Sequence, residues 1–226
     1  YGTEESAALY DMVFGKDAVP SDKSEVISVA DHIAASTIER GDTLMFRQMT
    51  GDLLYYISSK REAAFKEGLD YLIDEYILSK PEVWKSEDDS LKIVGMAQVM
   101  DDLLSKSSPG TKIPPLKVPG ELMSSKGGKK TVKTLSKLGG KRNYIMFFAR
   151  GCNVCAAEME AMRTILNDSD KSRGVKVFLV DVDDLLMTDP SLASTLFDAF
   201  DLTSLPLIIE TDAKGSIVRR YISFRF

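Results

Sequence analysis

Two cysteines, Cys152 and Cys155, form a Cys-x-x-Cys motif and are the only cysteines in the chain. An apolar run, residues 144–149, precedes the motif, and a run of helix-forming residues, 156–162, follows it. Thiol-disulfide exchange needs this order of strand, motif and helix, because the free N–H groups and positive dipole end at a helix N-terminus favour a thiolate. We expect Cys152 to be accessible and Cys155 to be the more shielded resolving thiol.

Two other uses of a Cys-x-x-Cys motif have to be weighed. Tetrahedral zinc takes about four nitrogen or sulfur ligands, and beyond the cysteines the chain offers a single, distant histidine, His32. We therefore expect no metal and no cofactor, and we expect His32 to be a partly buried packing residue at the edge of a helical stripe. A purely structural disulfide is the other alternative, but the loop that it would close between Cys152 and Cys155 is so short that it constrains the unfolded chain little.

Composition indicates a globular protein. The 226 residues, 44% hydrophobic and 28% charged, are enough for one large domain or two ordinary ones. No apolar stretch approaches the ~18 residues needed to cross a bilayer. Because the first residue is Tyr1 and not methionine, we expect a processed or trimmed N-terminus, and the sequence leaves the compartment open.

Charge is unevenly distributed along the chain. Through Ser107 there are 21 acidic and 11 basic residues, and the remainder has 13 acidic and 18 basic residues. The cations of the second half are scattered apart from residues 126–142, where no stacking aromatic residues are interleaved. We therefore expect no nucleic-acid partner.

The first half predicts an all-helical domain over residues 1–107. Apolar residues recur at helical spacing in four segments, and Gly41 suits the left-handed position after the first of them. Short connections between such helices favour a compact bundle. The four segments are residues 24–40, 44–57, 61–78 and 90–104.

The second half, residues 108–226, predicts an α/β domain. Prolines keep its first residues extended, and glycine-rich stretches at 126–130 and 139–140 read as turns. Strands and helices then alternate, which indicates a central mixed sheet with helices on both faces and strands buried on both sides. The expected elements are strands at 143–149, 175–182, 207–211 and 216–224, helices at 155–167 and 191–200, and a turn at 212–215.

These residues carry a resemblance to a known family. Residues 144–158, with 177–183, 205–210 and the 212–215 turn, resemble a thioredoxin fold, and more narrowly the TlpA/ResA-type envelope thiol-disulfide oxidoreductases. The stretch Pro-Gly-Thr-Lys-Ile-Pro at 109–114 is similar to one that often opens those proteins. The resemblance covers 108–226, and an all-α domain ahead of it is similar to some envelope lipoproteins of the group. It implies a thioredoxin-like three-layer domain.

The resemblance also implies roles for individual residues. Cys152 corresponds to the attacking thiol, Cys155 to the resolving thiol, and Pro206 to the proline that is cis in thioredoxin folds. A cis bond there would place the backbone of Leu205 beside the cysteines, where an extended substrate segment can pair with it. With Gly151, these two residues form the expected substrate-binding surface. An ordinary trans proline before a strand is the alternative for Pro206.

Two roles are possible for Glu158, which follows the motif. Glu158 lies one helical turn after the second cysteine. In the family a glutamate at this spacing is linked to proton handling between the thiols, whereas a glutamate early in a helix can simply cap it. Gly151 and Val154 stand where many relatives have Trp and Pro, so no relative's reduction potential transfers. Arg150 is expected to favour the thiolate electrostatically.

The residues and the resemblance together predict a protein-disulfide reductase or oxidoreductase of the cell envelope or periplasm. Its expected partners are disulfide-containing protein substrates and an upstream thiol reductant, with a lipid anchor upstream of Tyr1 as a further expectation from the resemblance. One alternative is a peroxiredoxin-like peroxidase, which would want a Thr or Ser shortly before its cysteine, and residues 147–151 offer none. The other is a non-catalytic binding module on a thioredoxin fold.

Overall fold

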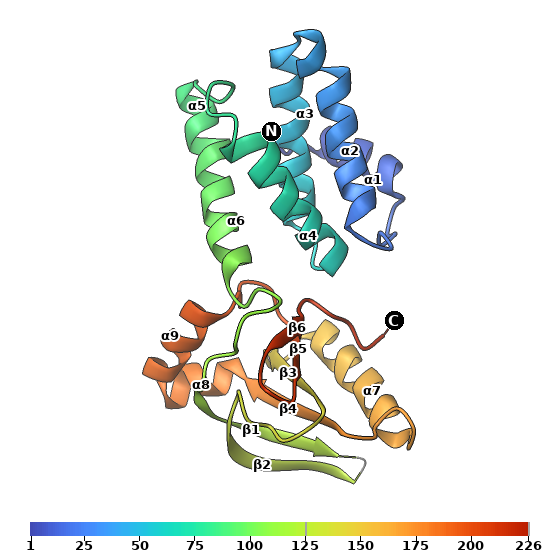
Figure 1. Ribbon diagram of the computed structural model, residues 1–226, viewed down its shortest axis with the longest axis vertical. Coiled ribbons are helices and arrows are strands. Elements are labelled where there is room, and N and C mark those ends of the chain that lie inside the picture. The colour runs from blue at the N-terminus through green and yellow to red at the C-terminus, as the bar shows by residue number, and fades with distance from the viewer. Residues whose placement is uncertain (125, 226) are drawn as a thin grey trace. The chain divides into compact units, whose positions relative to one another are not determined.

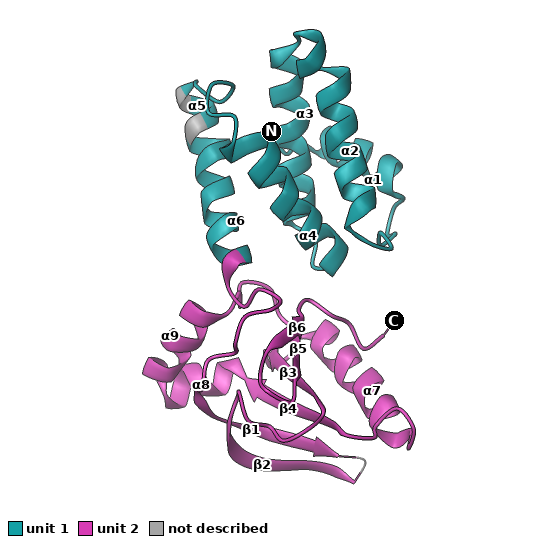
Figure 2. Cartoon of the chain, in the orientation of Figure 1, with its two compact units in different colours: residues 1–104 teal, residues 105–226 magenta. Residues whose placement is uncertain are grey.

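Two compact units make up the chain, residues Tyr1–Leu104 and Ser105–Phe226 (Figure 2). The computed structural model describes residues 1–124 and 126–225, apart from the side chains of Glu87 and Ser90. The division after Leu104 falls inside the last helix of the first unit, slightly before the boundary at residue 107 that the sequence predicts.

The first unit is all-helical, as predicted. Its elements are α1 (Glu4–Phe14), α2 (Lys23–Ser36), the 3₁₀ turn η1 (Ile38–Arg40), α3 (Thr43–Ser58), α4 (Ala63–Leu72), the π-helical η2 (Ile73–Leu78), α5 (Glu87–Asp89), η3 (Ser90–Val94) and α6 (Gly95–Ser105). The side chains of Thr3, Asp22 and Asp42 accept hydrogen bonds from first-turn N–H groups of α1, α2 and α3. Such caps explain where these three helices begin.

Two details of this unit differ from the sequence prediction. The helix expected over 24–40 ends at Ser36, because Thr37 leaves the helical conformation, and Gly41 in the left-handed region closes the short η1 turn instead. The sequence does not reveal α1, since Tyr10 is its only fully buried described residue and no apolar stripe results. His32 is exposed on α2, so its expected partly buried position is wrong; Ala30 and its neighbours supply the buried face.

The second unit is built on a six-stranded mixed sheet in the order β2-β1-β4-β3-β5-β6 (Figure 1). β3 and β4 are parallel, and the other pairs are antiparallel. The elements are β1 (Lys117–Ser124), β2 (Gly127–Thr134), β3 (Arg142–Phe148), α7 (Asn153–Asn167), β4 (Val175–Asp181), α8 (Val182–Thr188), α9 (Pro190–Ala199), β5 (Leu207–Asp212) and β6 (Ile217–Arg219).

Helices cover both faces of this sheet, with α7 on one side and α8 and α9 on the other (Figure 1). Residues along β3 alternate between the two cores that result. Ile145 and Phe147 lie in the core with α8 and α9, whereas Tyr144 and Met146 lie in the core with α7. The predicted burial of the central strands on both sides is confirmed.

Two parts of the sheet differ from the prediction. β1 and β2 form a hairpin where the sequence reads as an extended segment and turns, because β2 is an exposed edge strand without an apolar pattern. The strand expected over 216–224 ends already at Arg219 as β6. Beyond it Tyr221 takes a positive φ of 52°, and the chain leaves the sheet.

Gly120 in β1 packs so closely against β4 that a side chain has no room. A Cβ atom there would lie 2.3 Å from the carbonyl oxygen of Leu179 and 2.7 Å from the ring of Phe178. We expect Gly120→Ala to destabilise the protein by about 2 kcal/mol, measured as a lower urea midpoint. Gly128→Ala is the matched control, because the nearest atoms there all belong to the flexible Glu121 side chain. Equal midpoints for the two variants would contradict this packing argument.

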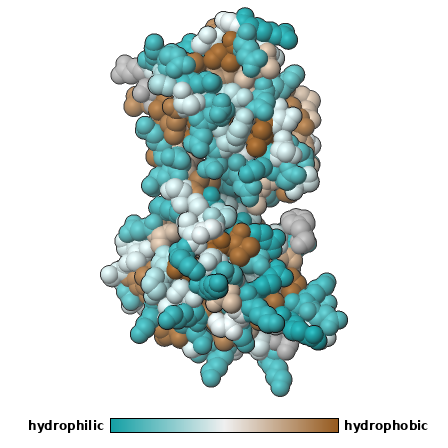
Figure 3. Space-filling view, viewed as in Figure 1, coloured by the Kyte–Doolittle hydropathy of each residue, from teal (hydrophilic) through white to brown (hydrophobic). Residues whose placement is uncertain are grey.

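None of the helices in the described part of the chain is long and apolar enough to cross a bilayer. The face shown in Figure 3 is mostly hydrophilic, and its apolar residues form small separate patches. Scattered apolar residues of this kind are normal on a protein surface and indicate no particular partner.

Candidate active site

The cysteine pair lies at the junction between β3 and α7. Cys152 is the N-cap residue of α7, and its Sγ accepts a hydrogen bond from the backbone N–H of Cys155 at 3.1 Å. Cys152 is half-buried, whereas Cys155 is 1% exposed. Gly151 makes the turn into the helix with a φ of +71°, a conformation that favours glycine. Cys152 is therefore the more accessible of the two cysteines and Cys155 the more shielded.

In this structure the two sulfurs form a disulfide. Once the pair is reduced, the sulfur of Cys152 remains at the amino end of a 15-residue helix. A backbone N–H that donates to sulfur, together with the helix dipole, stabilises a thiolate more than a thiol. The geometry thus leaves one sulfur of the pair partly exposed and the other buried.

A loop before β5 lies directly beside the sulfur of Cys152. The Leu205–Pro206 peptide bond is cis, and the carbonyl oxygen of Leu205 lies 3.9 Å from Cys152 Sγ. Both residues are half-buried, so part of the loop faces solvent next to the cysteines. The carboxylate of Asp201 anchors the start of this loop, because it accepts hydrogen bonds from the N–H of Thr203 at 3.2 Å and from its hydroxyl group.

Glu158 is buried one turn beyond Cys155, at 4% exposure. Its two carboxylate oxygens accept hydrogen bonds from the hydroxyl of Ser223 and from the backbone N–H of Phe224, each at 2.6 Å. The capping alternative does not describe this residue, since Cys152 caps α7 and the carboxylate faces residues outside the helix. A charged group can be buried at tolerable cost only with partners of this kind.

Arg150, two residues before Cys152, is paired with carboxylates. Its guanidinium group forms ion pairs with Asp181 at 2.7 Å and Asp184 at 2.6 Å, and its backbone N–H donates to Asp183. The side-chain hydrogen bonds to Asp181 and Asp184 raise the pKa of Arg150. These contacts tie the loop before the motif to the end of β4 and the start of α8.

The acidic residues that pair with Arg150 lie at the end of β4 and in the first turn of α8, and a signal for them exists in the sequence. Parallel strands end at the same edge of a sheet, so residues after β4 come close to the residues after β3. The sequence does not mark Ser223, which contacts Glu158, nor Asp201 and Tyr221, which bond to each other in and beside the loop that leads to Leu205. No motif marks them, and their contacts depend on how the chain returns after β6.

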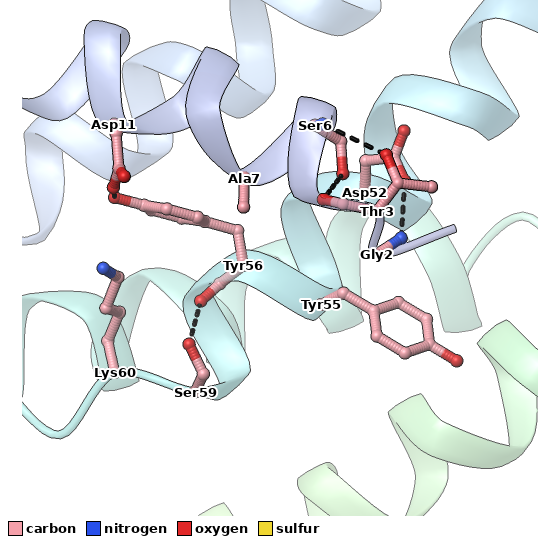
Figure 4. Close-up of a pocket in the computed structure, with 10 residues that line it drawn as sticks. All are labelled: Gly2, Thr3, Ser6, Ala7, Asp11, Asp52, Tyr55, Tyr56, Ser59 and Lys60. Carbon is pink, nitrogen blue, oxygen red and sulfur yellow. Dashed lines mark hydrogen bonds between the residues drawn. The ribbon is translucent and has the colours of Figure 1, made fainter.

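The helical unit contains a polar pocket (Figure 4). Asp52 accepts hydrogen bonds from Gly2 N–H and Gln48, and Asp11 accepts one from Tyr56. Since both carboxylates are already paired within the unit, we assign no chemistry to this pocket. Its lining consists of Gly2, Thr3, Ser6, Ala7, Asp11, Asp52, Tyr55, Tyr56, Ser59 and Lys60.

Comparison with known proteins agrees with the fold. A family model described as the AhpC/TSA family matches residues 109–224. No curated protein matches the chain. A thioredoxin-like protein from Bacteroides caccae is similar in structure, with a TM-score of 0.60 at 14% sequence identity over 98% of this chain and 80% of that one. The thioredoxin domain of a thiol-disulfide oxidoreductase from Bacteroides vulgatus aligns with 51% of this chain and 89% of its own, at 18% identity and a TM-score of 0.36.

Proposed function

Because the chain belongs to the AhpC/TSA family and carries its cysteine pair at the start of a helix, we propose that it is a thiol-disulfide oxidoreductase. The observation that carries the proposal is the placement of Cys152, half-buried at the N-cap of α7 and beside the carbonyl of Leu205. Gly151, Leu205 and Pro206 would form the surface against which an extended substrate segment pairs.

The proposed reaction begins with both cysteines reduced. The Cys152 thiolate attacks one sulfur of a substrate disulfide, forms a mixed disulfide and releases the other substrate sulfur as a thiolate. Cys155 then loses its proton to Glu158 and attacks the sulfur of Cys152. The second substrate thiolate leaves, and the Cys152–Cys155 disulfide remains. Two electrons have passed to the substrate, and an upstream thiol reductant restores the pair.

We further propose that the protein works in the reducing direction in the cell envelope or periplasm, on disulfides of envelope proteins, and that a lipid anchor holds it there. The likeness of residues 108–226 to the TlpA/ResA type supports this. Residues 1–107 would then be a separate helical domain.

Reduction of insulin and equilibration with glutathione test the proposal. We expect the protein to accelerate insulin reduction by dithiothreitol and to have a reduction potential more negative than about −200 mV, in the range of reducing thioredoxin-fold proteins. Failure to accelerate insulin reduction would contradict the oxidoreductase assignment. A potential near about −120 mV, that of a strong oxidant, would contradict only the reducing direction.

A peroxidase of the peroxiredoxin type is the alternative that the family match keeps in view. The site argues against it, because residues 147–151 carry no hydroxyl group before the first cysteine. Arg150 is also engaged by Asp181 and Asp184, so it does not face the sulfur as a free cation. Consumption of hydrogen peroxide at a rate above that of insulin reduction would favour the alternative.

A further inference from the structure

The residues after β6 return across the second unit and contact the site from a side that the motif does not predict. We call residues 220–225 the return segment; Figure 1 shows it running from β6 towards α7. The N–H of Ile222 donates to the carbonyl of Ile208 in β5 at 3.3 Å. The side chains of Ile222 and Phe224 pack against the core that contains Cys155, and the Phe224 ring lies 5.3 Å from that of Tyr144.

The return segment is also fastened to the loop on the other side of the cysteines. The hydroxyl of Tyr221 donates to Asp201 at 2.9 Å, in the loop that leads to Leu205. The segment therefore has anchors on β5, on this loop and in the core beneath α7. These anchors fix the position of the Ser223 hydroxyl and of the Phe224 N–H relative to the cysteine pair.

Both groups donate to Glu158, and the Ser223 hydroxyl also accepts a hydrogen bond from the backbone N–H of Arg225 at 3.1 Å. Ser223 donates to one carboxylate oxygen and the N–H of Phe224 to the other. Glu158 shares the buried face of α7 with Cys155 and Met162, at spacings of three and four residues. Residues so spaced are neighbours on a helix surface, so a carboxylate held on this face lies next to the resolving thiol.

We infer that Ser223 is a positioning residue for thiol-disulfide exchange. Its hydroxyl holds the Glu158 carboxylate in the orientation that accepts the proton of Cys155 during the resolving step. In that step the Cys155 S–H bond breaks, the proton passes to Glu158, a Cys155–Cys152 bond forms, and the bond from Cys152 to the substrate sulfur breaks. The inference rests on the proposed function and adds a residue outside the motif to it.

Single-turnover reaction with dithiobis(nitrobenzoate), a chromogenic disulfide, separates the two steps. Attack by reduced Cys152 releases one thionitrobenzoate, and resolution by Cys155 releases the second. We expect Ser223→Ala to slow the second release about tenfold, the loss typical for a hydrogen bond to a charged group, and to leave the first within twofold. Ser223→Thr, which keeps a hydroxyl, is expected to restore the second rate.

Controls distinguish positioning from a general loss of structure. Ser216→Ala is the matched control, because this half-buried serine is in the same unit but its hydroxyl is bonded to Lys112. In a Glu158→Gln background, Ser223→Ala should have no further effect on the second release. Thermal unfolding checks that each variant folds, and Ser223→Gly replaces the alanine variant if that one does not.

The outcomes are separable. A wild-type protein that releases no thionitrobenzoate faster than free cysteine would overturn the proposed function, and the inference with it. A wild type with both releases, but an unchanged second release in Ser223→Ala or equal slowing in Ser216→Ala, would overturn the inference alone.

Discussion

Replacing Cys155 by serine is expected to convert the protein into a trap for its substrate. Cys152 keeps its place at the helix N-terminus and can still attack a disulfide. The buried second sulfur, 1% exposed in the wild type, is the group that would release the product, and without it the mixed disulfide persists. Turnover in the insulin assay should be lost completely, while one insulin chain per protein becomes attached.

The measurement is unambiguous because the chain has two cysteines in total. Non-reducing electrophoresis and mass spectrometry should show the adduct with Cys155→Ser, and dithiothreitol should dissolve it. Cys152→Ser is the matched control, and it should form no adduct and show no turnover. An adduct with Cys152→Ser but not with Cys155→Ser would reverse the assignment of the two thiols.

Neutralising Glu158 is expected to have the second largest effect. Glutamine has the same shape, and its amide can still pair with Ser223 and with the N–H of Phe224, so the packing should survive. What it cannot do is accept the proton of Cys155. Since a positioned base contributes about 100-fold or more, we expect Glu158→Gln to slow release of the second thionitrobenzoate about 100-fold and to leave the first release within twofold.

Two further variants test the cause of this effect. Glu160→Gln removes a carboxylate from the exposed side of the same helix, where it pairs with Arg163, and should change neither release. Glu158→Asp keeps a carboxylate on a shorter side chain and should recover part of the rate. If Glu158→Gln resolves as fast as Glu160→Gln, the buried carboxylate serves packing only.

The sequence predicts the thioredoxin-like half well because its signals are local. Apolar runs mark β3, β4 and β5, and the strand, motif and helix follow one another within residues 142–167. The resemblance to a thioredoxin fold rests on these same segments, and the structure confirms it. The edge strand β2 escapes prediction for the opposite reason, since it is polar and exposed and owes its form to pairing with β1.

Helix positions in the first unit follow from apolar periodicity, whereas their limits do not. A stripe of apolar residues predicts α2, but the change to η1 after Ser36 depends on how Thr37 and Gly41 turn the chain. The exposure of His32 likewise depends on which face of α2 the neighbouring helices cover. Periodicity identifies the buried stripe and leaves residues at its edge undecided.

Local order along the chain is enough to establish a nucleophile at a helix N-terminus, because Cys152, Cys155 and the start of α7 are neighbours in sequence. Folding settles what surrounds that nucleophile. The donors to Glu158 come from 65 and 66 residues away, and the carboxylates that neutralise Arg150 from more than 30 residues away. The burial of Glu158 and the pairing of Arg150 arise only when segments distant in sequence pack together. Patterns of neighbouring residue types therefore cannot predict them.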